Sequence, residues 1–193
     1  MAVKQVDKSK TAKGWNNRIF WPKDNYIIRC ISSEFKPNNN GNPMVTNEWE
    51  VVNQEPKQIG EDLIDFDGAK FKSYHVIKVL NPEPDDDEAE VQAQEDSAKA
   101  FNRYAELLEK CGIDISEGYD DENPPMPKGK VVHASIYGKA TESRKSPTPE
   151  QRSKGQKVGD ILKDPITNKD VIAYQPTIEQ IYGLFDGVVA NPF

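Results

Sequence analysis

Alternating hydrophobic and polar residues run through most of this chain and predict a protein built mainly of β-strands. The clearest alternation lies in residues 26–52, where two strand-like runs flank the loop PNNNGNP. Asparagine and glycine adopt positive φ readily and proline lacks a backbone donor, so this segment predicts an antiparallel hairpin with a wide, flexible tip. In the second run, Trp49 alternates in phase with Val45 and Val51, which favours the core for Trp49 over a ligand platform.

Further strands are expected after the hairpin. Residues 62–80 alternate around a turn signal at Asp67 and Gly68 and predict one or two strands. One face of this segment is difficult to bury, because it carries Lys70, Lys72 and Tyr74. Residues 129–145 alternate again, and residues 170–176 predict a last short strand.

A single long helix is expected between these strand groups. Ser97 suits the N-cap position, apolar residues recur after it at helical spacing, and Gly112 supplies a stop signal. A short helix is also predicted over 177–184, within a C-terminal segment of residues 177–193. Strands before and after one long helix fit a five-stranded Greek-key barrel of the oligonucleotide/oligosaccharide-binding (OB) type, with the helix between strands three and four. We expect residues 15–176 to form this barrel, with long loops.

Length and composition limit the class of protein. The 193 residues suit one domain, and a hydrophobic content of 36% suits a modest core. No apolar run approaches the roughly 20 residues of a membrane span, and the N-terminus lacks the apolar block of a signal peptide. These features predict a cytoplasmic protein without a membrane partner.

The cysteines and histidines are isolated and argue against a metal or a cofactor. Cys30 and Cys111 have no neighbouring ligand pattern, and a reduced core pair is favoured over a disulfide. His75 and His133 also stand alone. With no glycine-rich phosphate loop and no nucleophile beside a histidine and an acid, we expect no catalysis and no cofactor. A metal-dependent nuclease is a weaker alternative, since no spaced acidic pair lies on a predicted rigid element.

Charge is segregated along the chain, so the net charge of -7 is misleading. Residues 128–157 hold 8 basic and 2 acidic side chains, whereas residues 81–123 hold 3 basic and 15 acidic ones. Residues 1–14 predict a flexible basic arm, which either follows a phosphate backbone or only solubilises the chain. Residues 82–96 predict an acidic surface loop or insertion, either merely solvated or competing with nucleic acid for a cationic groove. Residues 143–157 predict a long basic loop.

Aromatic rings beside lysines and arginines suit single-stranded nucleic acid, because bases stack on rings while phosphates pair with cations. The ordinary structural alternatives are core aromatics and solvated charges. The hairpin tip, flanked by cations, is a further candidate as a clamp on the strand. The candidate nucleic-acid-binding residues are Trp15, Arg18, Trp21, Arg29, Lys36, Lys70, Lys72, Tyr74, His133, Tyr137, Lys139, Arg144, Lys145 and Arg152.

Four short motifs in this order resemble those of bacteriophage-encoded single-stranded DNA-binding proteins with an OB barrel. They are Glu34 near the end of the first strand, the loop at residues 41–44, the Gly-Ile-Asp turn at residues 112–114 and the Gly-Lys pair at residues 129–130. The resemblance spans residues 14–175 and implies non-sequence-specific protection of single-stranded DNA during phage replication or recombination. The acidic insertion and the basic loop depart from the family, so contact residues there do not transfer.

The C-terminus carries a second, smaller resemblance. Replicative single-strand binders commonly end in an acidic tail tipped by aromatic residues, which other replication proteins bind, and this chain ends in Pro192 and Phe193. Only Asp186 among the last eight residues is acidic. The alternative function is a protein-binding adaptor or virion-associated structural module that uses the acidic loop and these terminal residues. Oligomeric state, site size and preference for DNA or RNA stay open at this point.

Overall fold

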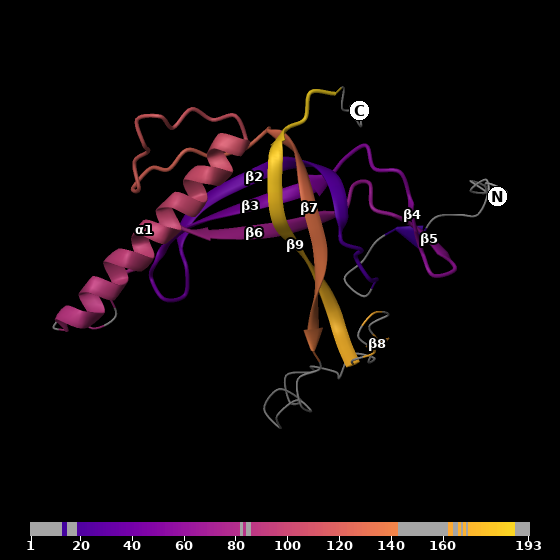
Figure 1. Cartoon of the computed structure of the whole chain (residues 1–193), viewed down its shortest axis with the longest axis horizontal. Coiled ribbons are helices and arrows are strands. Elements are labelled where there is room, and N and C mark those ends of the chain that lie inside the picture. Colours follow the sequence, from indigo (N-terminus) through magenta and orange to yellow (C-terminus); the bar gives the residue numbers. More distant parts are fainter. Residues whose placement is uncertain are drawn as a thin grey trace.

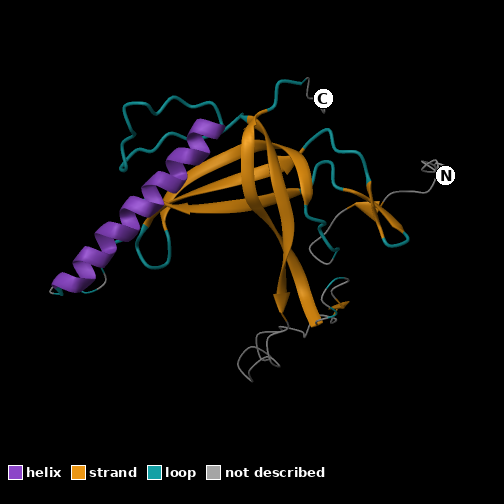
Figure 2. Cartoon of the chain, viewed as in Figure 1, coloured by secondary structure: helices purple, strands orange, loops and turns teal. Residues whose placement is uncertain are grey.

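The computed structural model describes residues 13–14, 19–81, 83, 86–142, 162–163, 166, 168 and 170–187. In this part of the chain the fold is mainly β with one helix (Figure 2). The elements in chain order are β1 (Lys13–Gly14), β2 (Asp24–Pro37), β3 (Pro43–Val51), β4 (Lys57–Ile59), β5 (Asp62–Asp65), β6 (Lys70–Val76), α1 (Asp87–Lys110), β7 (Val131–Glu142), β8 (Leu162–Lys163) and β9 (Asp170–Leu184).

The large sheet has the strand order β6-β3-β2-β7-β9-β8, and every neighbouring pair in it is antiparallel. Figure 1 shows β7 and β9 crossing the β2–β3–β6 ribbon at a steep angle, with α1 at one side. Between β6 and β9 no strand pairing occurs among the described residues, so the sheet is not closed into a barrel. The predicted mainly β fold, with five long antiparallel strands and one helix, is confirmed at this level.

A small second sheet lies beside the first, with the order β1-β5-β4. The predicted turn at Asp67 and Gly68 is present, and Gly68 has a φ of +76°. However, β5 and β6 on either side of it belong to different sheets and do not form a hairpin with one another. Of the predicted basic arm, only residues 13–14 are described, and they pair in parallel with β5.

The central hairpin forms as the sequence predicts. β2 and β3 pair antiparallel from Ile28 opposite Val51 to Pro37 opposite Pro43. At the tip, the Asn38 Oδ1 accepts hydrogen bonds from the backbone N–H groups of residues 40 and 42, at 2.9 and 3.1 Å. The Asn42 Oδ1 accepts another from the Leu80 N–H at 2.8 Å. The tip is therefore tied both to itself and to the chain that follows β6.

The core is formed by side chains of β2, β3, β5, β6, β7, β9 and α1. Trp49 is fully buried, as its alternation predicts, and its Nε1 donates a hydrogen bond to the Ser73 Oγ at 2.8 Å. Cys30 and Cys111 are both buried and free, which confirms the prediction for them. The largest fully buried side chains are Trp21, Trp49, Tyr26, Tyr104, Phe66, Ile28, Ile64, Ile77, Leu108, Ile136, Val45 and Val51.

The acidic segment differs from the prediction, because α1 begins at Asp87 and includes most of it. The Asp86 carboxylate accepts hydrogen bonds from the N–H groups of Glu88 and Ala89 at 2.9 and 3.1 Å, and three acids occupy the first turn. Negative side chains at this end are favoured by the helix dipole, which composition alone does not reveal. The predicted N-cap, Ser97, instead lies inside the helix and exchanges hydrogen bonds with the backbone of Val79.

The C-terminal helix predicted over 177–184 is also wrong, since this segment is the second half of β9. Ile178 and Ile181 stand three residues apart, as on a helix, yet they pair with Ile136 and Ala134 of β7, which are two apart. Irregularities in the β7–β9 register add the extra residue and bring both isoleucines to one face. The β-bulge therefore explains how a strand can carry this helix-like spacing. No described helix is long and apolar enough to cross a bilayer.

Candidate nucleic-acid interface

The outer face of β6 carries the three side chains that the sequence singled out there. Lys70, Lys72 and Tyr74 are exposed, while Phe71 between them is buried, so the predicted alternation is confirmed. Tyr74 is 55% exposed, so much of its side chain is open to solvent. Its cross-strand neighbour on β3 is Thr46.

Two glutamates on β3 share this face, and the sequence reasoning did not consider them. Glu48 lies opposite Lys72 and Glu50 lies opposite Lys70 in the register of β3 and β6. Glu50 forms ion pairs with Arg29 of β2 at 2.6 Å and with Lys70 at 3.9 Å. The face is therefore a mixed-charge surface rather than a purely cationic one. These glutamates can be placed beside the cations only when the register of β2, β3 and β6 is known.

Lys36 and Lys139 lie toward the far ends of their strands. Lys36, beside the hairpin tip, is exposed and pairs with Glu34 at 2.6 Å. Exposed pairs of this kind contribute little and exchange readily for another anion. Lys139 is exposed on β7, opposite Gln175 of β9, and makes no ion pair with any described residue.

Two other predicted residues lie on β7, which does not pair with β6. Tyr137 is half-buried and lies opposite Thr177 of β9. His133 is exposed, and its ring meets that of Phe185 edge to face at 5.0 Å. It borders a separate hollow of about 310 Å³ with Asn25 and residues 182–184. Since β6 and this end of β7 are not neighbours in the sheet, the structure does not bring His133 and Tyr74 together.

Trp21 is a correction to the predicted interface. Its side chain is fully buried, and its ring centroid lies 4.8 Å from that of Phe66, 5.3 Å from Tyr26 and 5.9 Å from Phe71. Burial of large aromatic rings against one another is a strong stabilising contribution to a core. Trp21 is thus a core residue that anchors the segment before β2, and it is not available for stacking on a base.

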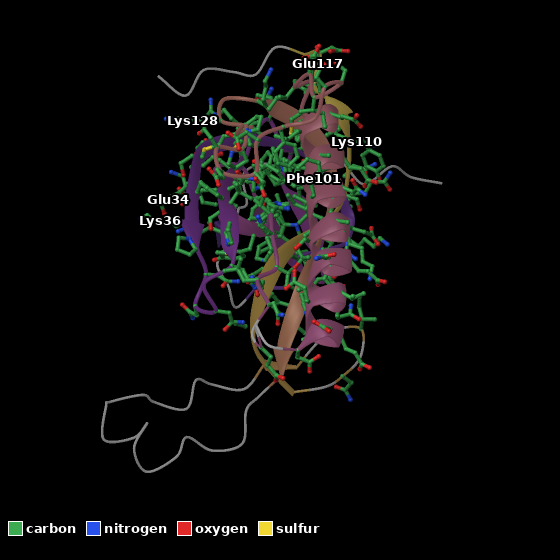
Figure 3. The ribbon with its side chains drawn as sticks, turned by 90° about the vertical axis from the view of Figure 1, so that its left-hand side faces the viewer. Glu34, Lys36, Phe101, Lys110, Glu117 and Lys128 are labelled. Carbon is green, nitrogen blue, oxygen red and sulfur yellow. The ribbon has the colours of Figure 1, made fainter. Side chains whose placement is uncertain are left out.

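A groove of about 650 Å³ runs between β6, α1 and β9, and we call it the β6–α1–β9 groove. Lys72 and Tyr74 form its β6 wall together with residues 73 and 75. The helix wall consists of Arg103, Glu106, Leu107 and Lys110, and residues 175–181 of β9 complete the lining. Figure 3 shows Lys110 on the helix, on the other side of the molecule from Lys128. The sequence reasoning missed Arg103 and Lys110, although their seven-residue spacing places both on one helix face.

His75 lies at the inner side of this groove and is largely buried. Its Nε2 lies 2.9 Å from the Ser73 Oγ, which also accepts the hydrogen bond from Trp49. Burial lowers the pKa of His75 to about 4. The imidazole is therefore neutral at pH 7 and adds no charge to the groove.

The remaining predicted site residues lie outside the described residues. They are Trp15, Arg18, Arg144, Lys145, Arg152, Pro192 and Phe193. Within the described part of the chain, no group of three or more histidine, cysteine, aspartate or glutamate side chains is arranged to hold a metal ion.

Comparisons with known proteins give no assignment. No protein-family model, curated protein or solved structure matches this chain significantly.

Proposed function

We propose that this protein binds single-stranded DNA without sequence specificity and protects it during phage replication or recombination. The observation that carries the proposal is the outer face of β6, where an exposed Tyr74 stands beside Lys72 on a regular strand. A ring that accepts any base, next to cations that accept any phosphate, is the combination that non-specific single-strand binders use.

The strand order supports this proposal. The five long strands occur in the chain in the order β2, β3, β6, β7 and β9, with α1 between β6 and β7 and the short strands β4, β5 and β8 as insertions. They lie side by side as β6-β3-β2-β7-β9. That is the arrangement expected of an OB fold opened between its third and fifth strands. OB folds bind oligonucleotides on the face of their second and third strands, here β3 and β6, and with the loops that follow strands one and four.

Both loops fit this role in sequence. The first is the hairpin tip at residues 38–42, beside Lys36. The second is the basic loop that the sequence predicts over residues 143–157, which contains Arg144, Lys145 and Arg152. The resemblance of the sequence to bacteriophage single-stranded DNA-binding proteins points to the same ligand. Pro192 and Phe193 stay candidates for contacts with replication or recombination proteins.

The test is a binding titration followed by the anisotropy of fluorescein-labelled oligonucleotides. Labelled nucleic acid is preferable to intrinsic fluorescence, because Trp21 and Trp49 are buried and cannot stack on a base. We expect oligo-dT to bind more tightly than duplex DNA, with an affinity that falls as salt rises. The same titration with RNA of matched length tests whether the protein prefers deoxyribose or ribose. Absence of oligo-dT binding at low salt would refute the proposal.

A further inference from the structure

Unpaired cations gather in the β6–α1–β9 groove. Lys72, Arg103 and Lys110 line it, and none of them forms an ion pair with another described residue. Arg103 and Lys110 are exposed, as is Lys72. Many of the other described lysines and arginines already pair with a carboxylate, namely Lys23, Arg29, Lys36, Lys57, Lys70, Lys78 and Lys99.

The acids of the groove do not cancel these charges. Glu179 is held by Lys23 at 2.6 Å and by the Ser135 hydroxyl at 3.0 Å, and these partners lower its pKa. Glu106 is the other acidic residue of the lining. Against three unpaired cations and a neutral His75, one free carboxylate leaves the groove with a positive local charge.

The occupant that fits is an extended anion rather than a peptide strand. A strand inserted between β6 and β9 would need them about 9.6 Å apart, twice the spacing of paired strands. Parts of β6 and β9 approach within 8 Å between Cα atoms, which is too close for such an insertion. Arg103 and Lys110 lie on one helix face about 10 Å apart along the axis, which suits successive contacts along one nucleic acid strand.

We propose that the single strand continues from Tyr74 into the β6–α1–β9 groove, where Arg103 and Lys110 bind its phosphates. This inference rests on the proposed function and adds a helix to the interface. Tyr74 and Lys72 belong both to the outer face of β6 and to the groove, so the two surfaces form one path. Glu106, between the two cations on the helix, opposes the strand and limits its affinity.

The decisive experiment compares two double variants of equal charge. Arg103→Gln with Lys110→Gln removes the groove cations, whereas Lys99→Gln with Lys128→Gln removes two exposed cations elsewhere. Lys99 pairs with Asp96 on α1 outside the groove, and Lys128 lies on the far side of the molecule (Figure 3). All four side chains are exposed, so both proteins should keep the thermal stability of the wild type, which melting curves check.

Oligo-dT affinity is measured for each protein from about 50 mM to about 500 mM salt. Loss of two phosphate contacts should reduce the slope of log affinity against log salt by about 1.4. If wild type and variant bind equally at 1 M salt, the variant should then bind roughly 60-fold more weakly than the wild type at about 50 mM. The control should keep the wild-type slope. If the wild type binds and both double variants share its slope, the groove inference is wrong while the proposed function stands. If the wild type does not bind oligo-dT, both are wrong.

Glu106→Gln provides a readout of opposite sign. Removing this carboxylate should tighten oligo-dT binding, an effect that a destabilised fold would not produce. Unchanged or weaker binding in this variant would contradict the place given to Glu106 on the path.

Discussion

Replacing Tyr74 tests the interface at the residue that carries the proposal. Tyr74→Ala removes the ring from the outer face of β6, and Tyr74→Phe keeps the ring but removes the hydroxyl. Because the side chain is 55% exposed, the alanine variant should fold normally. We expect its free energy of unfolding to fall by about 1 kcal/mol or less, the usual range for a cross-strand pair such as Tyr74 and Thr46.

The effect on binding follows from the exposed area of the ring. At 55% exposure, a side chain of about 200 Å² offers about 110 Å² to a base, or about 3 kcal/mol of apolar burial. This is the upper part of the range of about 1–3 kcal/mol for stacking one base on an aromatic ring. Oligo-dT affinity should therefore fall by about 5- to 150-fold in Tyr74→Ala and by much less in Tyr74→Phe.

The assay is the anisotropy titration with labelled oligo-dT at fixed low salt, with melting curves as a check on folding. Stacking is only weakly sensitive to ionic strength, so the loss should persist as salt rises. If Tyr74→Ala binds oligo-dT as tightly as the wild type, no base stacks on this ring and the face of β6 is not the interface. If Tyr74→Phe loses as much affinity as Tyr74→Ala, the hydroxyl carries the contact instead.

Three further predictions concern stability. His75 has a pKa of about 4 in the fold and about 6.5 in the unfolded chain, so keeping it neutral stabilises the fold fully above pH 6.5. As the pH falls to 4, about 3 kcal/mol of the free energy of unfolding is lost. Urea unfolding of His75→Gln should therefore show a smaller loss of stability in acid than the wild type. Gly138→Ala would place a Cβ 2.8 Å from the Trp21 Cβ and 3.2 Å from its backbone nitrogen, which should cost about 1–3 kcal/mol in urea unfolding, whereas Gly14→Ala, with no atom within 4 Å, should cost less. Asp86→Ala removes the cap of α1 and should cost about 1 kcal/mol, whereas equal stability would mean that the cap is dispensable.

Local chemistry predicted the central hairpin well. The Asn and Gly residues of the tip and the strict alternation of β3 both act within a few residues, and the structure reproduces them down to buried Trp49. The two segments that failed did so for different reasons, β9 because of a distant partner strand and the start of α1 because of capping and the helix dipole. In β9, the irregular pairing with β7 brings Ile178 and Ile181 to one face although their spacing is helical. In α1, the cap at Asp86 and the helix dipole favour acidic residues that, by composition alone, are typical of a loop.

The candidate site was predictable only residue by residue. The alternation of β6 identified Lys72 and Tyr74 as exposed without any knowledge of their neighbours. The ion pairs of Glu50 with Arg29 and Lys70 cannot be predicted until the register of three strands is known. The groove that joins Tyr74 to Arg103 needs β6, α1 and β9 in place together, and these elements are separated by long stretches of chain.

The two buried thiols have a practical consequence for mapping the strand. Cys30 and Cys111 are the two cysteines of the sequence, and both are buried and free. Burial raises the pKa of both thiols, that of Cys111 to about 12, so neither supplies much thiolate at neutral pH. A cysteine introduced on the surface would then react with maleimide probes far faster than the native pair. A dye can therefore be attached at one introduced cysteine without replacing Cys30 and Cys111. Energy transfer between this dye and a second dye on either end of the oligonucleotide would then report the direction in which the strand is bound.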